Sequence, residues 1–436
     1  MPSRAPADVP VSGNGDNFSP PVPVRSRRRA WLVFLLFSGT LINAIDRGSI
    51  STAAPQMMQD LHIDSVMMGV VLSSFLWAYL VLNIPAGLIA DRLGTKATLG
   101  WSAFVWSFFS ALTGLATRTW QVVLCRIGVG VGEAAINPVN TKIVRAHFPT
   151  AERGTVVGIY LSGFRLGFAV APIIMAYLIK AYSWRSAFVI TGVASLAWVA
   201  VWFFTYRQAD DETAPAGAAG RVPWRQLLRH RTIVGLVLCK FFQDYSYYLF
   251  VTWLPAYLVM ERKLTLIKSG WYAAIPWIVA FLFQPLVGWA SDVLIQRGWT
   301  ATRSRKGLVI AMNLLATVVV FAAYAESAGV AVLLLTLSLA FESAPSVLLW
   351  TVCAEVAPDR ASASVAGIMN SAGALAGIVA PIVTGYLLKT TGHFEEALMV
   401  GGAMFVFASL AMGLVVGKVE TIAVAANSPR SPGLAS

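Results

Sequence analysis

The sequence predicts an all-α membrane protein with twelve transmembrane helices in two pseudo-symmetric six-helix bundles. Composition is the first observation: 12% of the 436 residues are charged, 57% are hydrophobic, and the mean hydropathy is +0.67. Soluble domains carry about 25% charged residues, and a water-facing globule of this length cannot bury so many apolar side chains. The second observation is that apolar runs of about 20 residues, long enough to cross a bilayer, recur along the whole chain.

The predicted helices are apolar runs joined by short polar segments. In the first half they cover residues 31–53, 65–90, 97–116, 120–144, 154–180 and 185–206, and in the second half residues 232–260, 268–292, 306–325, 328–354, 361–389 and 394–417. We expect an N-terminal bundle over residues 31–206 and a C-terminal bundle over residues 232–417. The longest polar interval, residues 207–231, is the predicted cytoplasmic linker between them.

Both ends of the chain are polar. Residues 1–30 are rich in Pro, Ser and Gly and contain no apolar run before Trp31, so they predict a disordered tail and not a cleaved secretory signal. Residues 418–436 predict a second tail. We expect both tails to lie in the cytoplasm.

The positions of the basic residues support this orientation and argue against a nucleic-acid-binding protein, although the net charge is +12. Of the 33 Lys and Arg, 22 fall in the tails, the linker and the loops on the same side, whereas seven fall in the opposite loops. Because basic residues are retained on the cytoplasmic side, we expect the protein in a bacterial inner membrane with both termini in the cytoplasm. We attribute the basic residues of the linker to topology rather than to a lipid-headgroup site.

The two halves repeat each other. Gly87 and Asp91 after the second run match Gly288 and Asp292 after the eighth, an offset of 201 residues. In the fifth and eleventh runs, Gly158 matches Gly367 and Pro172 matches Pro381, an offset of 209 residues. Internal repeats of this kind are typical of transporter folds built from two similar halves.

Several segments resemble known transporter families. The segment G-x-x-x-D-R-x-G-x-K over residues 87–96, with a degenerate copy six helices later, resembles the signature of the major facilitator superfamily. Residues 42–47 (INAIDR), 75–79 (FLWAY), 126–134 (RIGVGVGEA) and 248–255 (YLFVTWLP) are similar to the anion:cation symporter family. The resemblance implies proton-coupled uptake, by alternating access, of an organic anion such as galactonate, glucarate or a hexuronate.

The resemblance does not define the solute. An aromatic or dicarboxylic acid remains an alternative on the same mechanism, and so do an exporter or proton antiporter and a solute sensor that does not transport. An enzyme is not expected, because the sequence contains no metal cluster and no nucleophile–base motif. No cofactor, metal or nucleic acid is expected. The expected partners are a small organic anion, protons and the bilayer, with the monomer as the functional unit.

Ionisable residues inside the predicted spans are candidate functional residues, because a charge within a membrane is costly. Four are cations and four are acids, so a fully ionised set carries no net charge. They are Asp46, Arg47, Arg126, Glu133, Arg165, Lys240, Asp244 and Glu342.

Asp46 and Glu133 are the candidates for proton coupling. Arg126 and Glu133 lie two helical turns apart on one face, so one arginine is able to sense both carboxylates. The resemblance assigns Asp46 and Glu133 to proton handling and either Arg47 or Arg126 to the substrate carboxylate, which a guanidinium binds with two hydrogen bonds. The alternative is a permanent ion pair between the first and fourth helices.

The remaining charges leave alternatives open. Arg165 stands where sugar-acid relatives often carry an uncharged polar residue, so it indicates either a second substrate carboxylate or a structural pair with Asp244 or Glu342. Lys240 and Asp244, four residues apart on one helix, are able to neutralise each other. Glu342 is a possible third titrating site.

Uncharged residues complete the candidate set. Tyr79, Asn370 and Ser371 are candidate ligands for solute oxygens, whereas Ala374 replaces an Asn that is frequent in sugar-acid relatives. For Trp350 we favour a role in helix packing over a role in closing the substrate site. The candidate gate residues are Asp91 and Arg92, and Glu355 is expected to make a gate or loop contact.

Overall fold

The computed structural model describes residues 26–207, 229–358 and 362–422, and every element in these ranges is helical. The first half contains α1 (Ser26–Asp60), α2 (Ser65–Thr113), α3 (Thr119–Glu133), α4 (Ile136–His147), α5 (Thr150–Ala181) and α6 (Trp184–Thr205). The second half contains α8 (Arg231–Met260), α9 (Leu266–Gln296), the π-helical turn η2 (Thr302–Lys306), α10 (Gly307–Ala316), α11 (Val319–Ala323), α12 (Ala328–Val356), α13 (Ser362–Thr391), α14 (Glu395–Leu410) and the π-helical turn η4 (Ala411–Val415).

These segments make twelve crossings. α2 supplies two of them because Gly94, with φ of 79° and ψ of 165°, turns the chain in a conformation that favours glycine. One crossing each comes from α3 with α4, from η2 with α10 and α11, and from α14 with η4. Among the described residues, ten stretches are long and apolar enough to cross a membrane. The other two crossings are the Ser- and Trp-rich part of α2 after Gly94 and α8, which carries Lys240 and Asp244.

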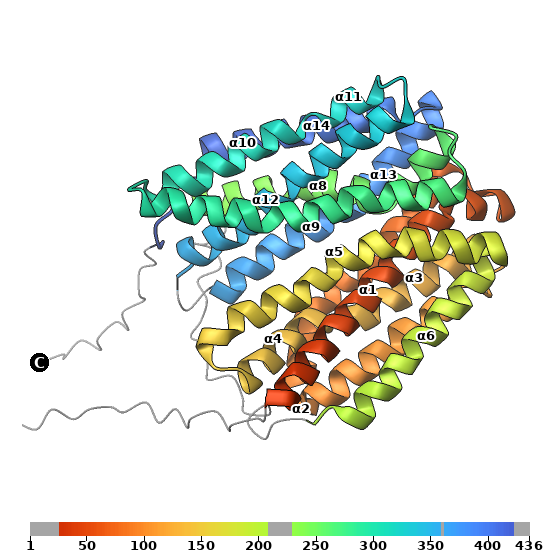
Figure 1. Cartoon of the computed structure of the whole chain (residues 1–436), viewed down its shortest axis with the longest axis horizontal. Coiled ribbons are helices and arrows are strands. Elements are labelled where there is room, and N and C mark those ends of the chain that lie inside the picture. Colours follow the sequence, from red (N-terminus) through yellow and green to blue (C-terminus); the bar gives the residue numbers. More distant parts are fainter. Residues whose placement is uncertain (1–25, 208–228, 359–361, 423–436) are drawn as a thin grey trace, which may run out of the picture.

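The helices form two bundles that lie side by side (Figure 1). The N-terminal bundle consists of α1–α6 and the C-terminal bundle of α8–η4. The bundles meet where α2 contacts α13, α5 contacts α9 and α1 contacts α8. The central face of the molecule is therefore built from both halves of the sequence.

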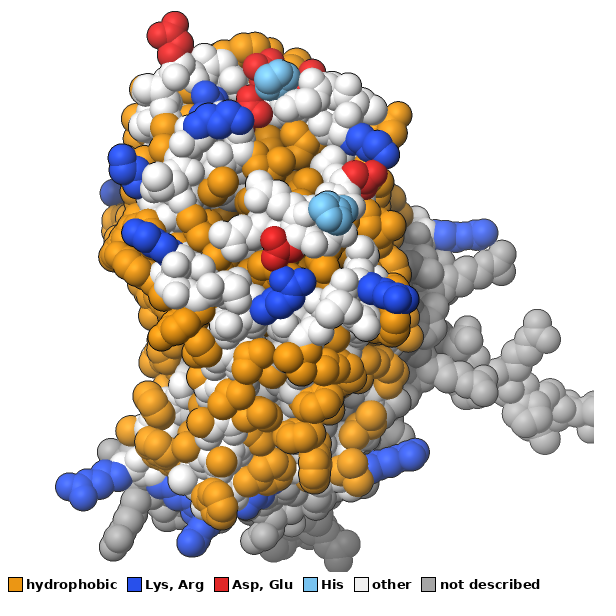
Figure 2. All heavy atoms as spheres, turned by 90° about the vertical axis from the view of Figure 1, so that its right-hand side faces the viewer, with side chains coloured by type: hydrophobic (Ala, Val, Ile, Leu, Met, Phe, Trp, Pro, Cys, Tyr) orange, Lys and Arg blue, Asp and Glu red, His pale blue; other side chains and the backbone are white. Residues whose placement is uncertain are grey.

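The outer surface carries large apolar side chains. Trp101, Phe204, Trp289, Phe321 and Leu414 are all exposed, which suits contact with lipid and not with water. Figure 2 shows the end of the molecule that lies at the right of Figure 1: charged and histidine side chains are spread over its upper part, and hydrophobic side chains cover most of the lower part. The chain is thus an integral multi-pass membrane protein.

Two similar contacts hold the bundles together at one end. A Cβ on Gly69 of α2 would lie 2.3 Å from the carbonyl oxygen of Pro381 on α13, and one on Gly270 of α9 would lie 2.7 Å from the carbonyl oxygen of Pro172 on α5. Gly69 and Gly270 are related by the offset of 201 residues, and Pro172 and Pro381 by the offset of 209. The same glycine-to-carbonyl contact is therefore made twice, once across each side of the pseudo-two-fold axis.

Candidate functional site

A cavity of about 630 Å³ lies between the two bundles. Within the described chain, its charged lining residues are three cations, Arg47, Arg165 and Lys240, and one acid, Asp244. Aromatic rings and amides form much of the rest of the wall. The volume is in the range that holds a small organic molecule, and the excess of cations favours an anion.

The cavity is closed at the end where the α1–α2 and α8–α9 loops lie, which we call the closed end. The Ser65 hydroxyl donates to the carbonyl of Gly385 at 2.7 Å, and the Lys389 ammonium pairs with Asp64 at 2.8 Å. Both interactions join α13 to the start of α2. Towards the opposite end, a Cβ on Gly158 or on Gly367 would meet no atom within 4 Å, so the bundles separate there.

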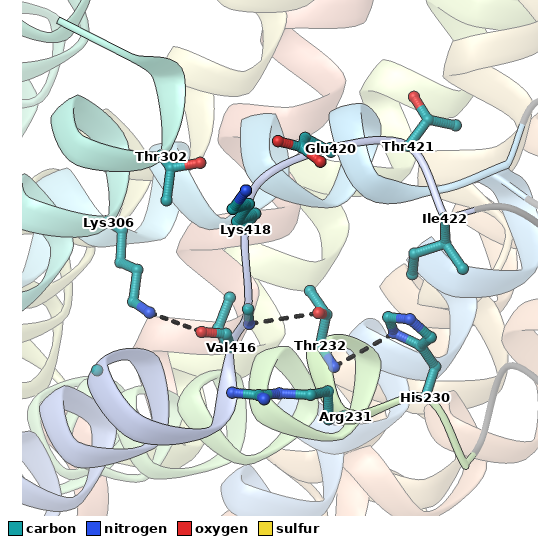
Figure 3. Close-up of a pocket in the computed structure, with 12 residues that line it drawn as sticks. His230, Arg231, Thr232, Thr302, Lys306, Val416, Lys418, Glu420, Thr421 and Ile422 are labelled. Atoms are coloured by element: carbon teal, nitrogen blue, oxygen red, sulfur yellow. Dashed lines mark hydrogen bonds between the residues drawn. The ribbon is translucent and has the colours of Figure 1, made fainter.

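A second pocket lies at this opposite end, within the C-terminal bundle (Figure 3). Two of its cations bind the backbone: Lys306 donates to the carbonyl of Val416 at 2.6 Å, and Arg231 donates to that of Val415 at 3.2 Å. These bonds satisfy carbonyls at the end of the last membrane helix, which supports a structural role for the pocket.

Arg47 connects the cavity to a buried carboxylate. It projects from α1, and its Nε donates to Glu133 Oε2 on α3. Its Nη2 is buried and has no hydrogen-bond partner among the described residues. The guanidinium lies 5.3, 5.1 and 5.6 Å from the ring centroids of Phe75, Tyr79 and Phe164. One donor of the guanidinium is thus held by the protein, while another is left for a further acceptor.

Asp46 is buried beside this pair without an ion pair of its own in the described structure. It is 1% exposed and accepts hydrogen bonds from the hydroxyls of Ser110 at 3.1 Å and Ser195 at 3.2 Å. Arg126 is 2% exposed, lies 5.0 Å from the ring of Phe75, and interacts electrostatically with both Asp46 and Glu133. Arg126 is not among the described residues that line the cavity.

The C-terminal bundle contributes a second set of charges. The Lys240 ammonium lies 2.7 Å from Asp244 Oδ1, so these two side chains pair on α8. The pair packs tightly against α13, because a Cβ on Gly373 would lie 2.1 Å from Asp244 Oδ2. The Trp350 ring lies 5.7 Å from the Lys240 ammonium. A neutralised pair in the cavity wall leaves Arg47 and Arg165 as the cations with free donors.

Glu342 is buried behind this wall. Its Oε1 accepts a hydrogen bond from Gln243 at 3.3 Å, and its Oε2 has no partner among the described residues. Arg165 lies 5.7 Å from the ring of Tyr247. It makes no ion pair within 4.0 Å in the described chain, so neither Asp244 nor Glu342 holds it.

Of the uncharged candidate ligands, some line the cavity and one does not. The Tyr79 hydroxyl accepts a hydrogen bond from Asn137 at 3.2 Å, and Tyr79, Asn370 and Ala374 line the cavity. Ser371 is not among the described lining residues, and its hydroxyl donates to the carbonyl of Gly367 at 3.0 Å.

The candidate gate residues lie away from the cavity. Arg92 is exposed near the turn at Gly94, and the side chain of Asp91 lies outside the described residues. Glu355 forms an ion pair with Arg305.

Sequence reasoning missed several polar and aromatic residues of this site. Tyr247 and Tyr248 line the cavity, and Ser110 and Ser195 hold Asp46. The serines lie 64 and 149 residues from Asp46 in the chain, so no local pattern connects them. A polar Gln243 directly before Asp244 was the available signal for the network around Glu342.

Fold and site together define a class: a membrane transport protein in which two helical bundles enclose a central charged cavity. The chain belongs to the Major Facilitator Superfamily, whose sequence profile matches residues 36–381.

Curated relatives match along most of the chain. A probable galactarate/D-glucarate transporter of Bacillus subtilis is 30% identical over 92% of this chain and 95% of the relative. The hexuronate transporter of the same organism is 31% identical, with 89% and 94% covered, and the D-galactonate transporter of Escherichia coli is 30% identical, with 91% and 97% covered.

Solved structures are similar in fold. A D-xylose–proton symporter superposes with a TM-score of 0.77 at 17% identity, covering 91% of this chain and all of the other. A bacterial homologue of the human lysosomal transporter Spinster superposes with a TM-score of 0.75 at 19% identity, with 90% and 97% covered. At these identities the likeness establishes the twelve-helix fold, which confirms the predicted fold class.

Proposed function

We propose that the chain is a proton-coupled symporter that takes up an organic anion, a sugar acid by analogy with the named relatives, as a monomer in a bacterial inner membrane. The observation that carries this proposal is the state of Arg47, which lines the cavity, donates to Glu133 through Nε and keeps a buried Nη2 with no partner among the described residues. A carboxylate entering the cavity completes that guanidinium.

The coupling follows from competition for Arg47. When the solute carboxylate binds, Glu133 loses part of its neutralising partner, and a buried unpaired carboxylate is costly. Taking up a proton removes that cost, so anion and proton bind together. Asp46 is held by two hydroxyls and has no ion pair to break in the described structure, so it accepts a second proton more directly.

Alternating access then moves the loaded site across the membrane. With both termini in the cytoplasm, as the basic residues favour, the closed end faces outwards and the cavity opens inwards. The halves over residues 31–206 and 232–417 rock around the site. At 100 mV each net positive charge moved inwards contributes about 2.3 kcal/mol, so the potential assists a monoanion only when more than one proton accompanies it.

The test is Glu133→Gln in proteoliposomes. We expect exchange of labelled substrate across the membrane to continue, because the neutral amide resembles the protonated acid. Accumulation driven by an inward proton gradient should be lost, since the side chain no longer releases its proton inside.

Glu326→Gln is the matched control, because Glu326 is exposed in the loop before α12. It should accumulate substrate as the wild type does. Gradient-driven accumulation by the Glu133→Gln variant would remove Glu133 from the coupling role.

A further inference from the structure

Two arginines in the cavity carry buried donors that nothing in the described chain satisfies. Arg47 reaches the cavity from α1 and keeps Nη2 free, and Arg165 reaches it from α5 and keeps Nη1 free. A buried guanidinium donor without an acceptor is costly. Each of these donors therefore marks a place where an acceptor is expected in the loaded protein.

The nearby acids of the protein are already engaged. Asp244 pairs with Lys240 at 2.7 Å, Glu133 pairs with Arg47, and Glu342 accepts from Gln243. Arg165 interacts with Asp244 and Glu342 only at a distance, beyond ion-pair contact. The Tyr247 ring, 5.7 Å from the Arg165 guanidinium, gives this cation an aromatic support but no acceptor of full charge.

We infer that the solute is an organic dianion, with one carboxylate bound by Arg47 and the other by Arg165. This inference rests on the proposed function and adds the substrate class to it. A cavity of about 630 Å³ accommodates a six-carbon diacid. The polyol carbons then lie between the two bound carboxylates, and Tyr79 and Asn370, which also line the cavity, offer hydrogen bonds to hydroxyls.

Galactarate and galactonate are the matched probes, because they differ only in the carboxylate or hydroxymethyl group at one end. Counterflow exchange in proteoliposomes measures the rate at which each solute is transported, without a proton gradient. The wild type should exchange galactarate with a kcat/KM higher by about tenfold or more, the size of one charge-assisted contact. Glucarate and gluconate repeat the comparison with another stereochemistry.

Arg165→Gln should lower kcat/KM for the diacids by about tenfold to a hundredfold and leave the monoacids nearly unchanged, which erases the preference. Arg165→Lys should restore part of it. Lys180→Gln is the matched control, since it removes one positive charge from the exposed end of the same helix and should change neither solute. Size-exclusion profiles in detergent identify any variant that fails to fold.

The outcomes separate the two proposals. If the wild type exchanges monoacids as well as or better than diacids, or if Arg165→Gln weakens both equally, the dianion inference is overturned while sugar-acid transport stands. If folded wild-type protein exchanges none of the four solutes, sugar-acid transport itself is overturned, and the dianion inference falls with it.

Discussion

Arg47 and Arg126 both interact with Glu133, yet Arg126 is buried and only Arg47 lines the cavity. The sequence left open which of them binds the substrate carboxylate. A guanidinium offers two parallel donors to a carboxylate, whereas a lysine ammonium is a single point of charge. The two positions are therefore distinguishable by the same conservative substitution.

We predict that Arg47→Lys lowers the affinity for substrate by about tenfold to a hundredfold, because the second donor to the carboxylate is lost. Arg126→Lys, the control, should leave substrate affinity near the wild-type value. Half-saturation in the counterflow assay measures both. Equal losses in the two variants would mean that Arg126 also contacts the substrate.

At this scale the sequence located the ionisable residues but not their partners. Because a charge within the membrane is energetically costly wherever it occurs, the sequence alone was enough to name the eight ionisable candidates. Their contacts depend on distant positions: Asp46 accepts hydrogen bonds from Ser110 and Ser195, and Arg165 lies against the ring of Tyr247. Serines and tyrosines are common in membrane helices for packing reasons, so nothing in their pattern marked these as part of the site.

The contacts between helices explain how the closed end is held. Gly69 and Gly270 let α2 and α9 approach the carbonyls of Pro381 and Pro172 more closely than a side chain permits. An added methyl group cannot displace a backbone carbonyl without moving a whole helix. These positions are therefore sensitive to the smallest substitution.

We predict that Gly69→Ala or Gly270→Ala shifts the protein towards states that are open at this end, because the overpacking costs about 1–3 kcal/mol. Spin labels at Met67 on α2 and Tyr386 on α13, both exposed, report the distance between the two bundles at the closed end by double electron–electron resonance. Gly329→Ala should leave the distance unchanged, since a Cβ there meets no atom within 4 Å. An unaltered distance distribution in the first two variants would contradict the prediction.

The helices themselves were predicted in number but not in extent. The apolar run at 31–53 belongs to α1, which covers Ser26–Asp60, because hydropathy marks the part that faces lipid while the helix continues into water. The run at 120–144 is divided between α3 and α4. The break between the runs at 65–90 and 97–116 was predicted, and the structure places it at Gly94, within one continuous segment α2.

Across the whole molecule, the bundles are also joined by the ion pair between Asp64 and Lys389. The pKa of Asp64 is lowered, chiefly by the hydrogen bond from Lys389 and by the backbone N–H of Met67. A lowered pKa means that the stabilisation is present above the ordinary aspartate value of about 3.9 and is lost only as the pH falls through the lowered value. Acidification to pH 5–6 therefore leaves this contact intact.

The pseudo-symmetry defines a position for a second ion pair, equivalent to the pair between Asp64 and Lys389, where the sequence has the lysine but not the carboxylate. The offsets of 201 and 209 residues relate Asp64 to Thr265 and Lys389 to Lys180. Thr265→Asp should therefore place a carboxylate beside Lys180 and still cap α9, as Thr265 does. Exposed ion pairs contribute up to about 1 kcal/mol, so the ratio of closed to open protein should rise by about fivefold at most.

The same spin-label pair measures this ratio at pH 7. Thr265→Asn is the control, because it keeps the cap without the charge. Lys180→Gln in the Thr265→Asp background should cancel the gain. A gain that survives loss of Lys180 would show that the two side chains do not meet.

At this scale the repeat in the sequence predicted the pairing of the halves, but not which end is closed. The closed end depends on interactions between bundles, such as that between Ser65 and Gly385, whose members lie 320 residues apart. The same chain is expected to close at either end in turn, so one sequence encodes both arrangements.

The doubled glycine-to-carbonyl contact has a consequence for descent. In a symmetric dimer of two identical six-helix chains, one glycine and one proline suffice to make both contacts, because every interaction across a two-fold axis occurs twice. Fusion of two copies of the gene for such a chain would keep both contacts without requiring any new type of contact. The closed end is then older than the single polypeptide, and later divergence distinguishes the two inherited copies: Asp64 pairs with Lys389, whereas the positions equivalent by the repeat carry Thr265 and Lys180.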